Sequence, residues 1–76
     1  MPETTLNLRG LKCPLPALKT RKALRGLAGG DVLLVETTDP LAALDIPNLL
    51  RETGDALEGQ EAVDGGLLFR IRKQAS

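Results

Sequence analysis

Residues 10–16, GLKCPLP, contain the one cysteine of the 76-residue chain, Cys13, followed at once by Pro14. A cysteine is a nucleophile in its thiolate form, and a helix N-terminus or a nearby cation lowers its pKa. Pro14 suits the first position of a helix, where its missing N–H would have no intrahelical partner. Cys13 is therefore expected at a helix N-terminus, with Lys12 and Arg9 close by in the sequence. These features predict a poised thiolate.

The residue types that the sequence lacks narrow the chemistry of Cys13. The chain has no histidine and no second cysteine. A Cys–His dyad, an intrachain disulfide, a CxxC redox cycle and a zinc cluster are therefore excluded, and no metal is expected. What remains is a single thiolate that accepts a group and passes it on. The alternative is a small buried cysteine with a purely structural role.

The formal charge is distributed unevenly along the chain, although it sums to zero. Residues 1–30 contain six lysines or arginines and one acid, whereas residues 31–76 contain four lysines or arginines and nine acids. No acid lies between Glu3 and Asp31, and Cys13 lies inside this stretch. The pattern indicates a positive field around the thiol, and the alternative is ordinary solvated surface.

The first half of the chain predicts a strand, a helix and a second strand. Residues 4–8 alternate apolar and polar side chains, as a half-buried strand does. Residues 14–28 have helical composition, with Pro14 at the first position and Pro16 still in the first turn. Three glycines are expected to end this helix: Gly26, Gly29 and Gly30. Residues 31–37 form a nearly continuous apolar run, which predicts a strand buried on both faces.

The next segment predicts two short helices. Asp39 is expected to be the N-cap of the first and Pro40 its first residue. Pro47 should interrupt this helix, because proline in a helix interior removes a hydrogen bond. Asp45 would then cap a second helix, which ends at Gly54.

Residues 56–73 predict two strands joined by a turn at Gly65–Gly66. The resulting order β-α-β-α-β-β favours an α+β fold, a two-layer α/β sandwich with two helices packed on one face of a four-stranded mixed sheet. A chain of this length allows a single domain, residues 1–76. The first crossover should be right-handed, which places Cys13 at the carboxyl end of the first strand. Ligands tend to bind at that edge of α/β sheets.

The sequence shows neither a signal peptide nor a membrane span. The first nine residues lack an apolar core, and no apolar run approaches the roughly 20 residues of a span. An unpaired thiol without an export signal points to the reducing cytoplasm.

One face of the predicted helix combines cations with exposed leucines. A helical wheel assigns these residues to the core side: Ala17, Thr20, Leu24, Leu27 and Ala28. The opposite side collects Leu15, Leu18, Lys19, Lys22 and Arg25, with Arg21 at its edge. Leucines ringed by cations beside a reactive thiol are typical of a docking surface for an acidic protein partner, and Arg9 is assigned to the same surface. An ordinary basic face with partly covered leucines is the alternative.

Direct nucleic-acid binding is not expected. Residues 26–29, GLAG, fit the GxxG pattern of KH loops, but that loop joins two helices and this segment runs from a helix into a strand. The basic half also has no aromatic residue on which a base could stack.

The segment LNLRGLKCPLPALKTRKAL resembles the signature of the TusA, or SirA-like, family of small sulfur carriers. The resemblance continues through GDVLLVETTDPLAALDIPNLL to the strand LLFRIRK. It implies a sulfurtransferase in which Cys13 bears a persulfide. Pro14 and Pro16 would complete the Cys-Pro-x-Pro motif, and Gly10 would match the glycine that precedes it.

The same resemblance implies a donor protein, such as a cysteine desulfurase or a rhodanese-like protein, and an acceptor protein whose cysteine takes the outer sulfur. No organic cofactor is expected, because sulfur itself is the cargo. The sequence departs from the family pattern at Asn7, at Leu49 and Leu50, and at Asp55, which bears on the partner that is served. The alternative, from another class, is a regulatory or interaction module in which Cys13 is structural.

Overall fold

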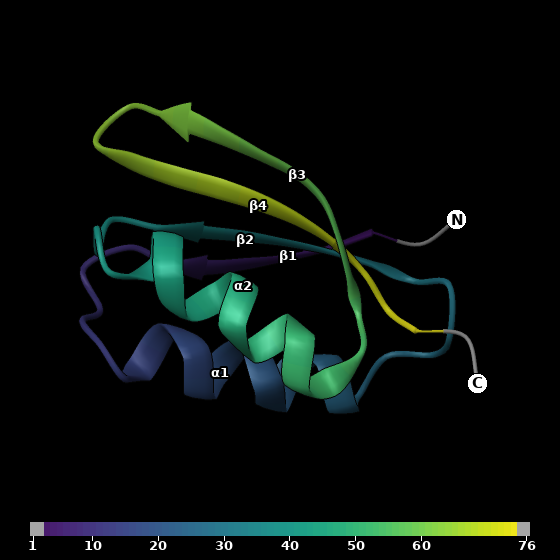
Figure 1. Cartoon of the computed structure of the whole chain (residues 1–76). Coiled ribbons are helices and arrows are strands. Elements are labelled where there is room, and N and C mark those ends of the chain that lie inside the picture. The colour runs from purple at the N-terminus through teal and green to yellow at the C-terminus, as the bar shows by residue number, and fades with distance from the viewer. Residues whose placement is uncertain (1–2, 75–76) are drawn as a thin grey trace.

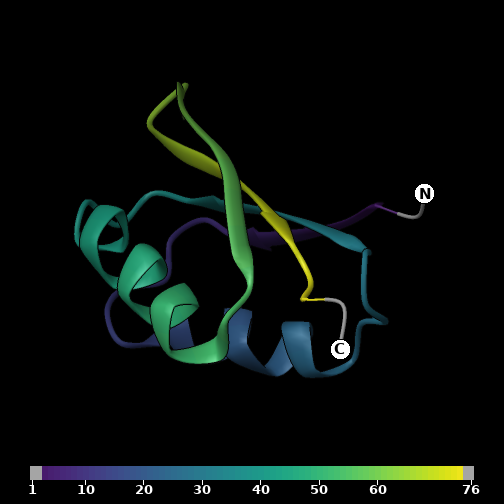
Figure 2. The same cartoon turned by 45° about the vertical axis from the view of Figure 1, so that its right-hand side comes forward.

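Two helices lie against one face of a four-stranded sheet (Figure 1), and the opposite face is open in the turned view (Figure 2). The computed structural model describes residues 3–74. Its elements are β1 (Glu3–Leu8), α1 (Leu15–Arg25), β2 (Val32–Thr37), α2 (Ala42–Thr53), β3 (Ala56–Val63) and β4 (Gly66–Arg72). The sheet order is β1-β2-β4-β3, with β1 parallel to β2 and the other pairs antiparallel. The predicted α+β sandwich with a mixed sheet is confirmed.

The core lies between the helices and the covered face of the sheet. Leu33 and Val35 of β2 point into it and are buried, whereas Leu34 and Glu36 are half-exposed on the open face. The prediction that this strand is buried on both faces is therefore wrong, because helices cover one face alone. The core cluster comprises Leu8, Leu24, Leu33, Val35, Ala42, Ile46, Leu50, Phe69 and Ile71.

Helix α1 is shorter than predicted at both ends. Pro14 is its N-cap instead of its first residue, and Gly26 caps its C-terminus. Ala28 is exposed, contrary to its assignment to the core face. The reason is a turn in which the Asp31 carboxylate accepts the Ala28 N–H and the Asp31 N–H donates to the Ala28 carbonyl. Three residues anchor the helix by burial: Pro16, Thr20 and Leu24.

Helix α2 runs without a break through Pro47, so the predicted pair of short helices is wrong. It begins at Ala42 instead of Pro40, and it ends before Gly54, which adopts φ +83°. Proline inside a helix costs about 3 kcal/mol. Burial of aliphatic side chains on both sides of it, each contributing about 1.5–3 kcal/mol, offsets this cost. These side chains are Ile46, Leu49 and Leu50, and the smaller Ala42 is buried beside them.

The β3–β4 turn is formed by Asp64 and Gly65, one residue earlier than predicted. Gly65 has φ +75°, and Gly66 already pairs with Val63 as the first residue of β4. A Cβ on Gly66 would overlap the carbonyl oxygen of Thr37. Glycine at this position therefore lets the hairpin pack against the end of β2. Within residues 3–74, no helix is both long enough and apolar enough to span a membrane.

Candidate functional site

Two loops meet at the edge where the parallel strands end. Leu8, the last residue of β1, pairs with Thr37, the last residue of β2, so both strands release the chain at the same level. The Gly10 N–H donates to Thr38 Oγ1 at 2.9 Å, which joins the two loops. Gly10 has φ +85°, a conformation that glycine adopts without strain. The loop that leads to the cysteine is thus fixed to its neighbour.

Asp39 anchors the backbone of the cysteine. Its Oδ2 accepts the Cys13 N–H at 2.6 Å, and its Oδ1 accepts the Leu41 N–H at 3.1 Å. Its own N–H donates to Thr37 Oγ1 at 3.2 Å, and the residue is buried. Asp39 therefore connects the end of β2, the cysteine loop and the start of α2. The prediction that Asp39 is the N-cap of this helix is wrong, because α2 begins three residues later, at Ala42.

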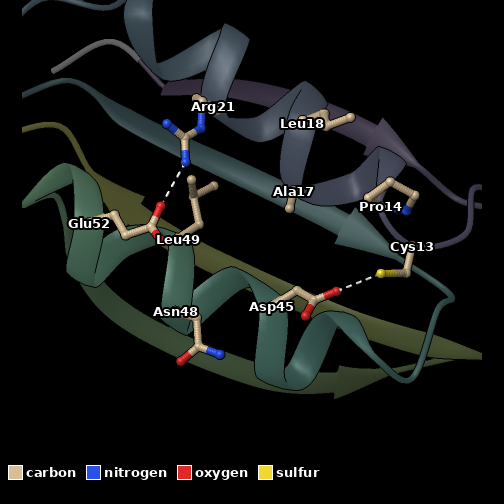
Figure 3. Close-up of a pocket in the computed structure, with 9 residues that line it drawn as sticks. All are labelled: Cys13, Pro14, Ala17, Leu18, Arg21, Asp45, Asn48, Leu49 and Glu52. Carbon is tan, nitrogen blue, oxygen red and sulfur yellow. Dashed lines mark hydrogen bonds and ion pairs between the residues drawn. The ribbon is translucent and has the colours of Figure 1, made fainter.

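The Cys13 side chain is exposed, as the sequence predicted, and it points across to α2 (Figure 3). Its thiol donates to Asp45 Oδ2 over 3.0 Å. This hydrogen bond raises the pKa of Cys13 above its ordinary value, and desolvation and the negative charges of Asp45 and Asp39 raise it further. The prediction of a lowered pKa is therefore wrong. The hydrogen bond and the two carboxylates therefore favour the protonated thiol over the thiolate.

The cations expected beside the sulfur are not its partners. Arg9 donates to Glu36 Oε2 at 2.6 Å and to the Asp64 carbonyl at 2.8 Å, so its guanidinium is held against the sheet and the hairpin turn. Lys12 is exposed, and its carbonyl accepts the Leu15 N–H at 2.9 Å. The acid-free stretch of sequence therefore does not give an acid-free neighbourhood in space.

A groove of about 280 Å³ runs between α1 and α2, with Cys13 at one end (Figure 3). At the other end Arg21 and Glu52 form an ion pair of 2.8 Å that joins the two helices. The groove is lined by Cys13, Pro14, Ala17, Leu18, Arg21, Asp45, Asn48, Leu49 and Glu52. Among residues 3–74, no three His, Cys, Asp or Glu side chains are grouped so that they could hold a metal ion.

Comparison with known proteins assigns the chain to a family. The profile described as "Sulfurtransferase TusA" matches residues 4–73. The chain belongs to the sulfurtransferase TusA family. It is 42% identical over 73 residues to the sulfur carrier protein TusA of Pseudomonas entomophila, covering 96% of this chain and 91% of that protein. It is 45% identical over 65 residues to a putative sulfur carrier protein of Neisseria meningitidis serogroup A, covering 86% of this chain and 88% of that protein.

The outer surface of α1 in this TusA-family protein is basic and partly apolar. Leu15 is 43% exposed and Leu18 55% exposed. Exposed cations accompany them on α1: Lys19, Lys22 and Arg25. Arg21, which the sequence assigned to the edge of this surface, instead pairs with Glu52 across the groove. The predicted combination of leucines and cations therefore exists, with one cation neutralised.

The sequence interpretation missed the two acids that α2 and the preceding loop bring to Cys13. Asp39 and Asp45 were assigned as helix caps, and both instead contact Cys13. Leu41 and Leu44, 52% and 66% exposed, precede Asp45 in the sequence. The available signal for Asp39 was its place directly after β2, since the ends of neighbouring parallel strands meet at one edge.

Proposed function

We propose that Cys13 is the residue that carries sulfur, as a persulfide, in this TusA-family protein. The observation that carries the proposal is the exposed sulfur at one end of the α1–α2 groove, on the one cysteine of the chain. Its backbone is held by Asp39, so the sulfur is presented from a fixed position. Pro16, the second proline of the motif, is buried and fixes the first turn of α1 behind it.

The loading step is an exchange between a thiol and a persulfide. The Cys13 thiolate attacks the outer sulfur of a persulfide on the donor's cysteine. A new S–S bond forms on Cys13, the donor's S–S bond breaks, and the donor cysteine leaves as a thiolate that takes up the proton released by Cys13. No electrons enter or leave the pair, and no cofactor is needed. Discharge repeats the exchange: the acceptor cysteine attacks the outer sulfur, and Cys13 is the leaving group.

The donor is of the cysteine desulfurase or rhodanese-like type, and the acceptor is a protein cysteine. We assign their docking to the exposed face of α1, where Leu15 and Leu18 supply apolar contact. Lys19, Lys22 and Arg25 there favour an acidic partner surface. A free thiol that cycles through a persulfide requires a reducing compartment, so we place the protein in the cytoplasm. In this role the chain is a stoichiometric carrier more than a multiple-turnover enzyme.

Mass spectrometry tests the proposal directly. The protein is incubated with a cysteine desulfurase and cysteine, its thiols are alkylated, and the tryptic peptide 13–19 is examined. We expect the mass of one additional sulfur on this peptide and none on a Cys13→Ser variant. A wild-type protein that stays unmodified, or a Cys13→Ser variant modified to the same extent, would support the alternative of an interaction module with a structural cysteine.

A further inference from the structure

Asp45 lies at the Cys13 end of the groove, and no cation among residues 3–74 forms an ion pair with it. Among residues 3–74, the ion pairs join arginines of α1, β4 and the loop after β1 to Glu3, Glu36, Glu52 and Glu58. Asp45 takes part in none of them. Its hydrogen bond is to the Cys13 thiol, and its carboxylate lines the groove. A carboxylate in this position is a receptor for positive charge from outside.

The charged groups around the groove leave the Cys13 end negative. α2 contributes Asp45 and Glu52, the loop after β2 contributes Asp39, and α1 contributes Arg21. Arg21 neutralises Glu52 at the far end, 2.8 Å away. Asp39 and Asp45 remain at the near end, where both contact Cys13. The carboxylates that contact Cys13 are thus opposite in charge to the cations on the outer face of α1.

We propose that Asp45 selects the proteins with which Cys13 reacts. In the isolated protein its carboxylate holds the thiol through a hydrogen bond. A partner that places a lysine or arginine against Asp45 frees the sulfur. The inference rests on the proposed sulfur-carrier function. A cation at Asp45 competes with the thiol for the carboxylate oxygen and cancels the charge that opposes ionisation. The thiolate then forms where the donor or acceptor cysteine is already in place.

The proposal defines the chemistry of the partner surface. An acidic region must face the cations of α1, and a basic side chain must lie beside the partner's reactive cysteine. A small anionic thiol or persulfide meets Asp39 and Asp45 first and is repelled. Asp45 therefore favours protein partners over anionic small molecules, which protects the sulfur in transit from loss to them.

Small disulfides that differ in charge test this selection without any partner protein. The reduced protein is treated separately with cystamine, which is cationic, with 2-hydroxyethyl disulfide, which is neutral, and with dithiodipropionate, which is anionic. Rates of mixed-disulfide formation are followed by mass spectrometry, and each is divided by the rate of the same reagent with a neutral cysteine peptide, because the leaving thiols differ in pKa. We expect cystamine to react about fivefold faster than the neutral reagent and the anion about fivefold slower, the effect of one charge at about 4 Å in water.

Three variants locate the cause. Asp45→Asn should bring the three rates within about twofold of one another and make the neutral reagent faster, because the thiol is no longer held by a carboxylate. Asp45→Glu should retain the order of rates. Glu61→Gln removes the same charge from β3, outside the groove lining, and should leave all three rates unchanged. Circular dichroism confirms that each variant is folded.

Two outcomes would overturn the inference: an order of rates that survives in Asp45→Asn, or an anionic reagent that reacts fastest with the wild type. A measurement on the wild type alone gives a second check, since the advantage of cystamine should disappear in 1 M salt, where the screening length is about 3 Å. These rates do not depend on persulfide formation. Failure of the sulfur-carrier proposal and failure of the selection are therefore separate results.

Discussion

The Cys13 sulfur lies 3.0 Å from Asp45 Oδ2, a contact between residues 32 positions apart in the sequence. This hydrogen bond connects the start of α1 to the first turn of α2 and closes one end of the groove between them. It also makes the thiol a weaker acid than an ordinary cysteine. The reactivity of the site is therefore set by residues on α2 and the loop before it.

The first prediction concerns the pH dependence of thiol reactivity. Asp45→Asn removes the negative charge and the strong hydrogen-bond acceptor, so the pKa of Cys13 should fall. Alkylation by iodoacetamide follows the thiolate fraction, and its rate curve should move to lower pH. At pH 7.5 the variant should react about fivefold faster than the wild type, the effect of one charge near the sulfur.

The matched control is Glu61→Gln, whose alkylation curve should superimpose on that of the wild type. A curve for Asp45→Asn that moves to higher pH would mean that the carboxylate promotes ionisation of the thiol, contrary to the hydrogen bond between them.

The second prediction concerns the role of Asp39 as an anchor. Asp39→Ala removes the acceptors of the Cys13 and Leu41 N–H groups. The Cys13 N–H is part-buried, and an unpaired buried donor costs about 1–3 kcal/mol. The free energy of unfolding in urea should fall by about this amount, and the Cys13 amide should exchange faster with deuterium. Unchanged exchange at Cys13 would show that the loop is held by other contacts.

Local patterns identified the elements of the fold because each pattern lies within the element that it predicts or next to it. Alternation in β1 and β4, the apolar run of β2 and the glycine after α2 all depend on neighbours in the sequence. The errors arose where a distant contact competes with a local rule. Pro47 should break a helix, yet burial of Ile46, Leu49 and Leu50 in the core keeps α2 continuous.

The candidate site shows the same division between local and distant information. Cys13 stands out by its motif, and its exposure follows from its place before α1. The electrostatic environment of Cys13 does not follow from its place in the sequence, because Asp39 and Asp45 reach it from 26 and 32 residues away. The cations beside Cys13 in the sequence point elsewhere, as Arg9 does toward Glu36. A charge count along the chain therefore missed the two carboxylates that raise the pKa of Cys13.

The third prediction tests the docking face of α1. Lys22→Glu reverses a charge on its exposed surface and should slow persulfide loading by the desulfurase about tenfold at low ionic strength, because electrostatic complementarity governs encounter rates. The difference should shrink as salt is added. Loading is measured from the mass of peptide 13–19 at short times.

The control for this variant is Arg51→Glu, an equal charge reversal at an exposed position near the end of α2, outside the groove lining. It should load at the wild-type rate. Equal slowing by both variants would point to net charge instead of a docking face on α1.

The fourth prediction concerns Thr20, a fully buried residue of α1 whose hydroxyl oxygen has no hydrogen-bond partner among the described residues. Thr20→Val keeps the shape of the side chain and replaces the unpaired hydroxyl with a methyl group. We expect the free energy of unfolding to rise by about 1–2 kcal/mol. Urea titration followed by circular dichroism measures it, since the chain has no tryptophan or tyrosine.

Thr37 provides the matched control, because it is equally buried but its hydroxyl accepts the Asp39 N–H at 3.2 Å. Thr37→Val leaves that buried donor unpaired and should lower the free energy of unfolding by about 1–3 kcal/mol. The same substitution thus has opposite signs at two buried threonines, because one hydroxyl has a partner and the other has none. A loss of stability in both variants would show that the Thr20 hydroxyl is satisfied in solution.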